Sequence, residues 1–473
     1  MSPTQATDPL PKTEYLANLS GMQSDNGSTA LKKSAQLEEE DSSVQVKVSS
    51  LDADDDAPRT ACDRIASQIA VNRSVTAPLH RLPPELLAEI FLNLHNYPYS
   101  TSELSTLDRS IARVCITWRQ VALGTPRLWA FIVVQPKTIN AEEYLRRYLP
   151  RSKSCPLYIL CDTAGQPGLL PLLSEHASRW HTLSLRTCCA DSRAMTPVAT
   201  PLLQCARVIV SDMLDAEHSG LLGFLRHTPK LRDLVVRGCG IEAAAKLTVP
   251  ASRVLVTLDL AFHKPYSLAS ILTSIQQYSK TLKELRLSLA GDAVDASSVG
   301  RTITLPALRS LCVVRKGLSV LPRISTPSLY MLCVDTRPAT FPSVFLDFLE
   351  RASLNICMLD LLFDGRVSSA VEADTAMLLR CMTRMKGLEQ MRIRRCPAFE
   401  AFLTGLAWKE DAPVILPNLK MVAMLQDKDA PQSPSVFEEL CRSRRMSTAS
   451  RGPYVIGTVE GMRLETVMRD LRL

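Results

Sequence analysis

Cysteine and histidine are the residue types in this chain that could bind a metal ion or act as nucleophiles. The sequence contains 14 cysteines and 7 histidines. Zinc sites need several Cys or His residues at short, regular spacing. The cysteines here stand singly apart from Cys188-Cys189, no C-x-x-C pair occurs, and the histidines are dispersed. We therefore expect no metal site and no cofactor.

The sequence also lacks the motifs that commonly carry catalysis. No G-x-S-x-G, no phosphate-binding loop of the Walker type and no H-E-x-x-H is present. A catalytic triad can assemble from residues that are distant in sequence. With no candidate nucleophile or base standing out, we expect this protein not to be an enzyme.

A repeat dominates the second half of the chain. The pattern L-x-x-L-x-L, or a close variant, begins at ten positions separated by steps of 21 to 32 residues: Trp180, Cys205, Leu231, Leu255, Leu282, Leu308, Leu329, Ile356, Leu388 and Leu419. A period of this length is typical of leucine-rich repeats. Each copy supplies one short strand, which must stack on its neighbours to bury its apolar face. We expect an α/β solenoid over residues 135–473.

Two further features agree with this prediction. Cys188, Cys239 and Cys396 each follow the last inward apolar residue of a copy by three positions, where the consensus allows Cys or Asn. We interpret them as buried thiols of the solenoid. The segments 267–277 and 370–380 have one apolar helical face and are expected to pack behind the sheet.

Residues 80–134 are predicted to form a small helical unit. One helix should run from Pro84 to Leu94, and a second run should extend from Leu107 to Ala122, ended by Gly-Thr-Pro at 124–126. Small domains bury only about 60% of their chain surface. The many apolar residues of this unit therefore need a cover from outside it.

Charge is distributed unevenly along the chain. Residues 1–60 carry 11 acidic and 5 basic side chains, although the whole chain has a net charge of +7. Such a polar, acidic segment is expected to be disordered. We expect a short linker helix over residues 61–79. We find neither a signal peptide nor a run of about 18 apolar residues, so we expect no membrane partner and a location in the cytoplasm or nucleus.

The helical unit resembles an F-box. The matching residues are Leu82-Pro83-Pro84-Glu85-Leu86-Leu87 with Ile90-Phe91, then Val114-Cys115-x-x-Trp118-Arg119-x-x-Ala122, then Pro126-x-Leu128-Trp129. The whole chain is similar to a large fungal group in which an F-box precedes degenerate leucine-rich repeats. The resemblance implies an α+β protein with a three-helix F-box at 80–134, followed by the solenoid.

The resemblance also implies partners and a site. An F-box binds an adaptor of the Skp family, which joins it to a cullin-RING scaffold, and the repeats select an unknown protein substrate for ubiquitin transfer. The residues implied to contact the adaptor are Leu82, Pro83, Leu86, Leu87, Ile90 and Phe91. Those implied to close the three-helix core or to reach the same surface are Val114, Cys115, Trp118 and Val121. Between these two roles the sequence does not decide, although Trp118 and Trp129 are better placed in the core.

Two other functions remain as alternatives. The chain could be a non-catalytic repeat scaffold that works outside a ubiquitin ligase, with the F-box-like helices capping the solenoid. A nucleic-acid binder ranks last, because no run of Lys and Arg is dense or interleaved with aromatic residues. The substrate itself is unreadable. Its contacts would fall on variable positions between the inward residues: Arg232, Asp233, Lys283, Glu284, Arg286 and Arg392.

Overall fold

The structure is a computed structural model. It describes residues 82–95, 110–136, 138–163, 166, 168–188, 198–210, 222, 225, 227–238, 252–263, 266–290, 302–335, 341–351, 356–362, 371–394, 399–407, 415–425, 440 and 443. The predicted disordered segment and linker helix lie outside these residues, as do Cys239 and Cys396. The described chain falls into two compact units, which meet in sequence between Thr125 and Pro126.

The first unit is helical. Helix α3 (Pro84–His95) matches the predicted helix closely, and its first backbone bond runs from Leu87 N to Pro83 O at 3.1 Å. The predicted second helix is interrupted. Residues 110–114 are helical, Cys115 is extended with φ −155°, and α5 (Ile116–Gly124) starts afresh after it. The prediction of one continuous run was wrong because Cys115 caps a new helix, a local geometry that apolar periodicity does not encode.

The second unit is built on a parallel sheet of twelve strands. They follow one another in the sheet in the order of the sequence, so each strand pairs with the strand of this sheet that precedes it in the chain. The strands of this sheet are β1 (Phe131–Val134), β2 (Leu157–Asp162), β3 (Trp180–Thr187), β4 (Cys205–Val210), β5 (Asp233–Gly238), β6 (Thr257–Phe262), β7 (Glu284–Leu289), β9 (Ser310–Arg315), β11 (Met331–Asp335), β12 (Met358–Leu362), β13 (Gln390–Arg394) and β14 (Met421–Leu425). Two short strands, β8 (Ile303–Thr304) and β10 (Ile324–Ser325), pair separately.

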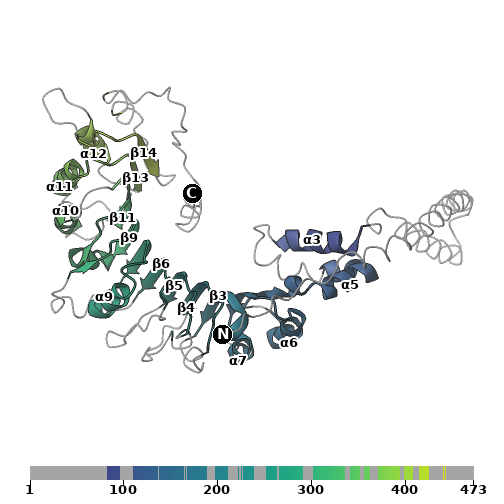
Figure 1. The fold of residues 1–473 in the computed structure, drawn as a ribbon. Coiled ribbons are helices and arrows are strands. Elements are labelled where there is room, and N and C mark those ends of the chain that lie inside the picture. The colour runs from purple at the N-terminus through teal and green to yellow at the C-terminus, as the bar shows by residue number, and fades with distance from the viewer. Residues whose placement is uncertain are drawn as a thin grey trace, which may run out of the picture. The chain divides into compact units, whose positions relative to one another are not determined.

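Helices and short 3-10 helices connect several of these strands, as parallel pairing requires, and one more, η2 (Pro126–Ala130), leads into β1. The connecting helices are α6 (Ala141–Arg151), α7 (Leu169–Ser174), η3 (Ala177–Arg179), α9 (Leu268–Gln276), η5 (Lys316–Arg323), α10 (Phe341–Arg351), α11 (Val371–Arg384) and α12 (Phe399–Leu406). Helices α9 to α12 lie on one side of the row of strands (Figure 1). The helices predicted at 267–277 and 370–380 are confirmed as α9 and α11.

Two rows of buried side chains cross the sheet, with at most one residue of each row on each strand. The first row is Ile132, Ile159, Leu183, Ala206, Leu234, Leu258, Leu285, Leu311, Leu332, Leu359, Met391 and Val422. Each is at most 7% exposed. The second row lies two residues later in the strands from β1 to β13, for example Leu260 and Leu287. Alternate residues of each strand therefore form the core.

The register corrects one copy of the predicted repeat. Ala206, not Val208, pairs with Leu183 and Leu234 in the first row. The copy therefore begins at Leu203, which is fully buried, rather than at Cys205. The small Ala206 occupies the place of a leucine here. The prediction relied on large apolar residues and therefore placed the start of this copy two residues too late.

The sheet also begins earlier than the sequence indicated. Strand β1 lies in residues 80–134, which were expected to belong to the helical unit, yet it pairs with β2 over four residues. The Phe-Ile-Val-Val run of β1 is apolar enough for either environment, and only the pairing with β2 places it. None of the described helices is long and apolar enough to cross a lipid bilayer.

Candidate functional site

The inner face of α3 holds the first unit together. Leu87 and Phe91, one helical turn apart, are 1% and 0% exposed. The ring of Phe91 lies against the indole of Trp118 on α5, with centroids 4.9 Å apart and planes tilted by 56°. Tilted aromatic pairs at this separation are favourable beyond their buried area. Leu87 and Phe91, which the resemblance implied would contact the adaptor, are therefore buried within their own unit, and Trp118 is half-buried.

The outer face of the same helix carries two large apolar side chains. Leu86 is 52% exposed and Ile90 is 43% exposed, and they stand one turn apart. Pro83, Glu85 and Glu89 are exposed beside them. An exposed apolar pair rimmed by charged residues is typical of a surface that binds another protein.

Helix α5 is fixed by local hydrogen bonds. The backbone N–H of Trp118 donates to Cys115 Sγ at 3.4 Å, which caps the helix. The guanidinium Nε of Arg119 donates to the carbonyl of Ala112 at 2.9 Å, which ties the residues before the cap to α5. The indole Nε1 of Trp118 is buried and has no hydrogen-bond partner within the described part of the chain.

The remaining predicted contact residues lie at intermediate positions. Val114 is 58% exposed, whereas Leu82, Cys115 and Val121 are half-buried. Two exposed residues were missed. Ile116 and Leu123 are 72% and 41% exposed, and their separation of seven residues places them on one face of α5. Their spacing is visible in the sequence. Both residues were missed because the region was predicted as one continuous helix with a single apolar face.

Trp129 lies in the second unit rather than with the helices. It packs edge-on against Tyr148 with ring centroids 4.9 Å apart, and the guanidinium of Arg151 lies 4.6 Å from its centroid. Its assignment as a core residue is confirmed, at 3% exposed. Trp129 matches the motif of the helical unit in sequence, but it packs in the core of the second unit, against α6.

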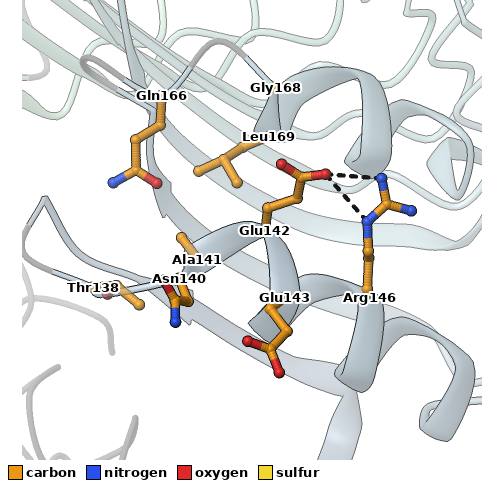
Figure 2. A pocket seen from close by; sticks show the side chains of 9 residues that line it. All are labelled: Thr138, Asn140, Ala141, Glu142, Glu143, Arg146, Gln166, Gly168 and Leu169. Carbon is orange, nitrogen blue, oxygen red and sulfur yellow. Dashed lines mark hydrogen bonds and ion pairs between the residues drawn. The ribbon is translucent and has the colours of Figure 1, made fainter.

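An open hollow of about 750 Å³ lies on the second unit, at the start of α6. Figure 2 shows its lining, in which Glu142 Oε1 accepts from Arg146 Nη2 at 2.8 Å. Glu142 and Glu143 occupy the first turn of the helix, where negative charge is favourable. Each carboxylate pairs with an arginine one turn later, Arg146 and Arg147. The lining carries two carboxylates against one guanidinium, which disfavours an anion, and it contains no Ser, Cys, Lys or His. We therefore assign this hollow no chemistry.

The buried thiols are inert. Burial, with a smaller effect of the neighbouring Asp162 carboxylate, raises the pKa of the Cys161 thiol to about 12. Burial likewise raises the pKa of Cys381 to about 12. Cysteines with such values are not nucleophiles. Cys188, expected to be buried, is partly exposed. Within the described ranges, no group of three or more His, Cys, Asp or Glu could hold a metal ion.

The positions expected to face a substrate lie on or beside the strands. Glu284 and Arg286 alternate with the buried Leu285 and Leu287, so they lie on the face opposite the leucine rows. Arg392 pairs in register with Asp360 on that same face. Arg232 and Lys283 directly precede β5 and β7 and are exposed, and Asp233 is half-buried.

Two comparisons with known proteins find no relative of this chain. No protein-family model matches the chain, and no curated protein matches it either.

Proposed function

We propose that this chain is an F-box protein, the substrate-recognition subunit of a cullin-RING (SCF-type) ubiquitin ligase. The first unit binds a Skp-family adaptor, and the second unit binds the protein to be ubiquitinated. The chain itself catalyses no reaction. The observation that carries the proposal is the exposed apolar pair Leu86 and Ile90, which lies on the helix of the F-box-like motif while Leu87 and Phe91 hold the same helix to its own unit.

The second unit supports a recognition role. We interpret its twelve described strands as a leucine-rich-repeat-like solenoid, because they follow one another in sequence order and the repeated pattern recurs every 21 to 32 residues. Such a sheet leaves one long face for a macromolecular partner. A ligase subunit of this kind works in the cytoplasm or nucleus.

The adaptor face can be tested by co-purification. Wild-type chain should bind a Skp-family adaptor, and a Leu86→Asp, Ile90→Asp variant should lose binding by about 100-fold or more, because two carboxylates would have to be desolvated on contact. Ile139→Asp is the matched control. Ile139 is 83% exposed and lies in the second unit, so this variant should bind like wild type.

Two results would change the proposal. If the double variant binds the adaptor as well as wild type while circular dichroism shows both folded, the α3 surface is not the adaptor site. If the wild-type complex forms but supports no ubiquitin transfer with a reconstituted cullin-RING scaffold, the chain works as a repeat scaffold outside a ligase.

A further inference from the structure

A row of exposed cations lies at the N-terminal ends of β5, β7 and β9. The backbone ladder continues one residue before the strands. The N–H of Val256 donates to Arg232 O, that of Lys283 to Val256 O, and that of Arg309 to Lys283 O, each at 2.8 Å. Arg232, Lys283 and Arg309 therefore stand in one line across β5, β6, β7 and β9. All three are exposed, and none has an ion-pair partner among the described residues.

The nearest acids leave this charge largely uncompensated. Asp259 on β6 has a side chain that is 8% exposed, and its Oδ2 lies 3.0 Å from Arg237 Nη2 and 3.6 Å from Arg286 Nη1. Two cations therefore share one carboxylate. Asp233 accepts from the thiol of Cys205 at 3.2 Å. Glu284 is the one exposed acid among the described residues of these strands.

The excess is local to this stretch of the sheet. Between residues 205 and 316 the described residues include eleven Lys or Arg and three Asp or Glu. Between residues 331 and 425 they include seven Lys or Arg and eight Asp or Glu. Among the described residues, cations therefore outnumber acids over β4 to β9 but not from β11 onward. A field of one sign confined to one part of a surface attracts a ligand of the opposite sign to that part.

We propose that this basic edge, defined by Arg232, Lys283 and Arg309, binds an anionic segment of the substrate protein. The inference rests on the proposed function and gives its substrate a chemical class. Carboxylate and phosphate groups are the anions that such side chains bind, so the segment is rich in Asp and Glu or is phosphorylated.

The length of the row fits a short peptide. Neighbouring strands lie about 4.8 Å apart, so Arg232 and Arg309 are separated by about 14 Å, the span of four or five extended residues. Nucleic-acid affinity depends on many phosphate contacts, about 6–10 in a typical complex. A row of three exposed cations beside Glu284 suits an acidic peptide better than a duplex.

Fluorescence anisotropy of the full chain tests this. The probes are fluorescein-labelled peptides of equal length, one with consecutive Glu residues, one with phosphoserines and one with Ser only, and a short DNA duplex. We expect the anionic peptides to bind and the Ser peptide not to bind. An exposed ion pair contributes about two- to threefold in affinity, so Arg232→Ala, Lys283→Ala, Arg309→Ala together should weaken binding about tenfold.

The matched control removes the same charge elsewhere. Arg380→Ala, Arg384→Ala, Lys386→Ala alters exposed cations of α11 and the turn after it, and should bind the peptides like wild type. If both triple variants lose the same peptide affinity, the loss reflects the change in net charge alone, and the proposal is overturned. Tighter binding of the duplex than of either peptide would also overturn it, in favour of nucleic acid.

The two anionic arms identify the source of the charge, because a preference for phosphoserine assigns a phosphorylated segment and equal binding assigns an acidic one. Adaptor binding, measured on the same triple variant, should not change. A failure of peptide binding with adaptor binding intact therefore rejects this inference alone, and leaves the proposed function standing.

Discussion

The rings of Phe91 and Trp118 lie with their centroids 4.9 Å apart, and this contact decides which residues of α3 face outward. With Phe91 turned toward α5, Leu87 follows it inward at the preceding turn. Leu86 and Ile90 must then point away from the unit. The proposed adaptor surface is thus a consequence of one aromatic contact inside the helical unit.

Truncating Phe91 should loosen α3, whereas truncating Ile90 should not. Phe91→Ala removes a fully buried ring and is expected to lower the stability of the helical unit by about 3–5 kcal/mol. Ile90→Ala removes a side chain that is 43% exposed and should cost less than about 1 kcal/mol. Hydrogen exchange of peptides that cover residues 84–95 measures both. Similar protection in the two variants would show that the ring pair does not anchor the helix.

The sequence predicted α3 and most strands well, for a physical reason. Proline is tolerated in the first turn of a helix and disfavoured in its interior, so Pro84 marks a helix start, and apolar residues at regular spacing indicate a common buried face. The start of α5 was not predictable in this way. Cys115 ends one helical segment by capping the next, and a thiol is not among the preferred caps. Likewise Ala206 fills a leucine position that only pairing with Leu183 and Leu234 reveals.

The sequence indicated α3 as the candidate site, but it did not show which side chains of the helix face outward. Leu86 and Leu87 are adjacent, as are Ile90 and Phe91, so both pairs satisfy the same helical period. Their side chains point about 100° apart, and the sequence cannot say which of the two faces α5. The basic edge was even less visible, because its cations are about 25 to 50 residues apart and meet only through the register of the sheet.

Asp259 should matter more to the sheet than an exposed acid does. Asp259→Ala leaves Arg237 and Arg286 without their shared carboxylate, and we expect a loss of about 1–3 kcal/mol after allowing for the partial exposure of both arginines. The control is Glu389→Ala, which breaks an exposed ion pair with Lys420 and should cost less than about 1 kcal/mol. Urea denaturation followed by circular dichroism compares them. A larger loss in the Glu389 variant would contradict the assignment.

Gly317, at the start of η5, should not tolerate a side chain. A Cβ there would lie 2.9 Å from the backbone oxygen of Leu287, and backbone of a central strand cannot move aside easily. Gly317→Ala should therefore destabilise the second unit by about 1–3 kcal/mol. Gly124, whose Cβ would have nothing within 4 Å, supplies the control: Gly124→Ala should leave thermal stability nearly unchanged. Equal melting temperatures for all three proteins would show that η5 can shift away from β7.

Cys161 should make stability fall at alkaline pH. Burial raises the pKa of its thiol from 9.0 to about 12 in the folded state. Above about pH 9 the unfolded chain loses this proton while the folded chain keeps it, so unfolding is increasingly favoured until pH reaches about 12. The contribution is fully present below pH 9 and declines by about 1.4 kcal/mol per pH unit above it. Urea unfolding of wild type and Cys161→Val between pH 8 and about pH 11 isolates it. The variant should have the shallower decline, and parallel curves would mean that the thiol ionises equally in both states.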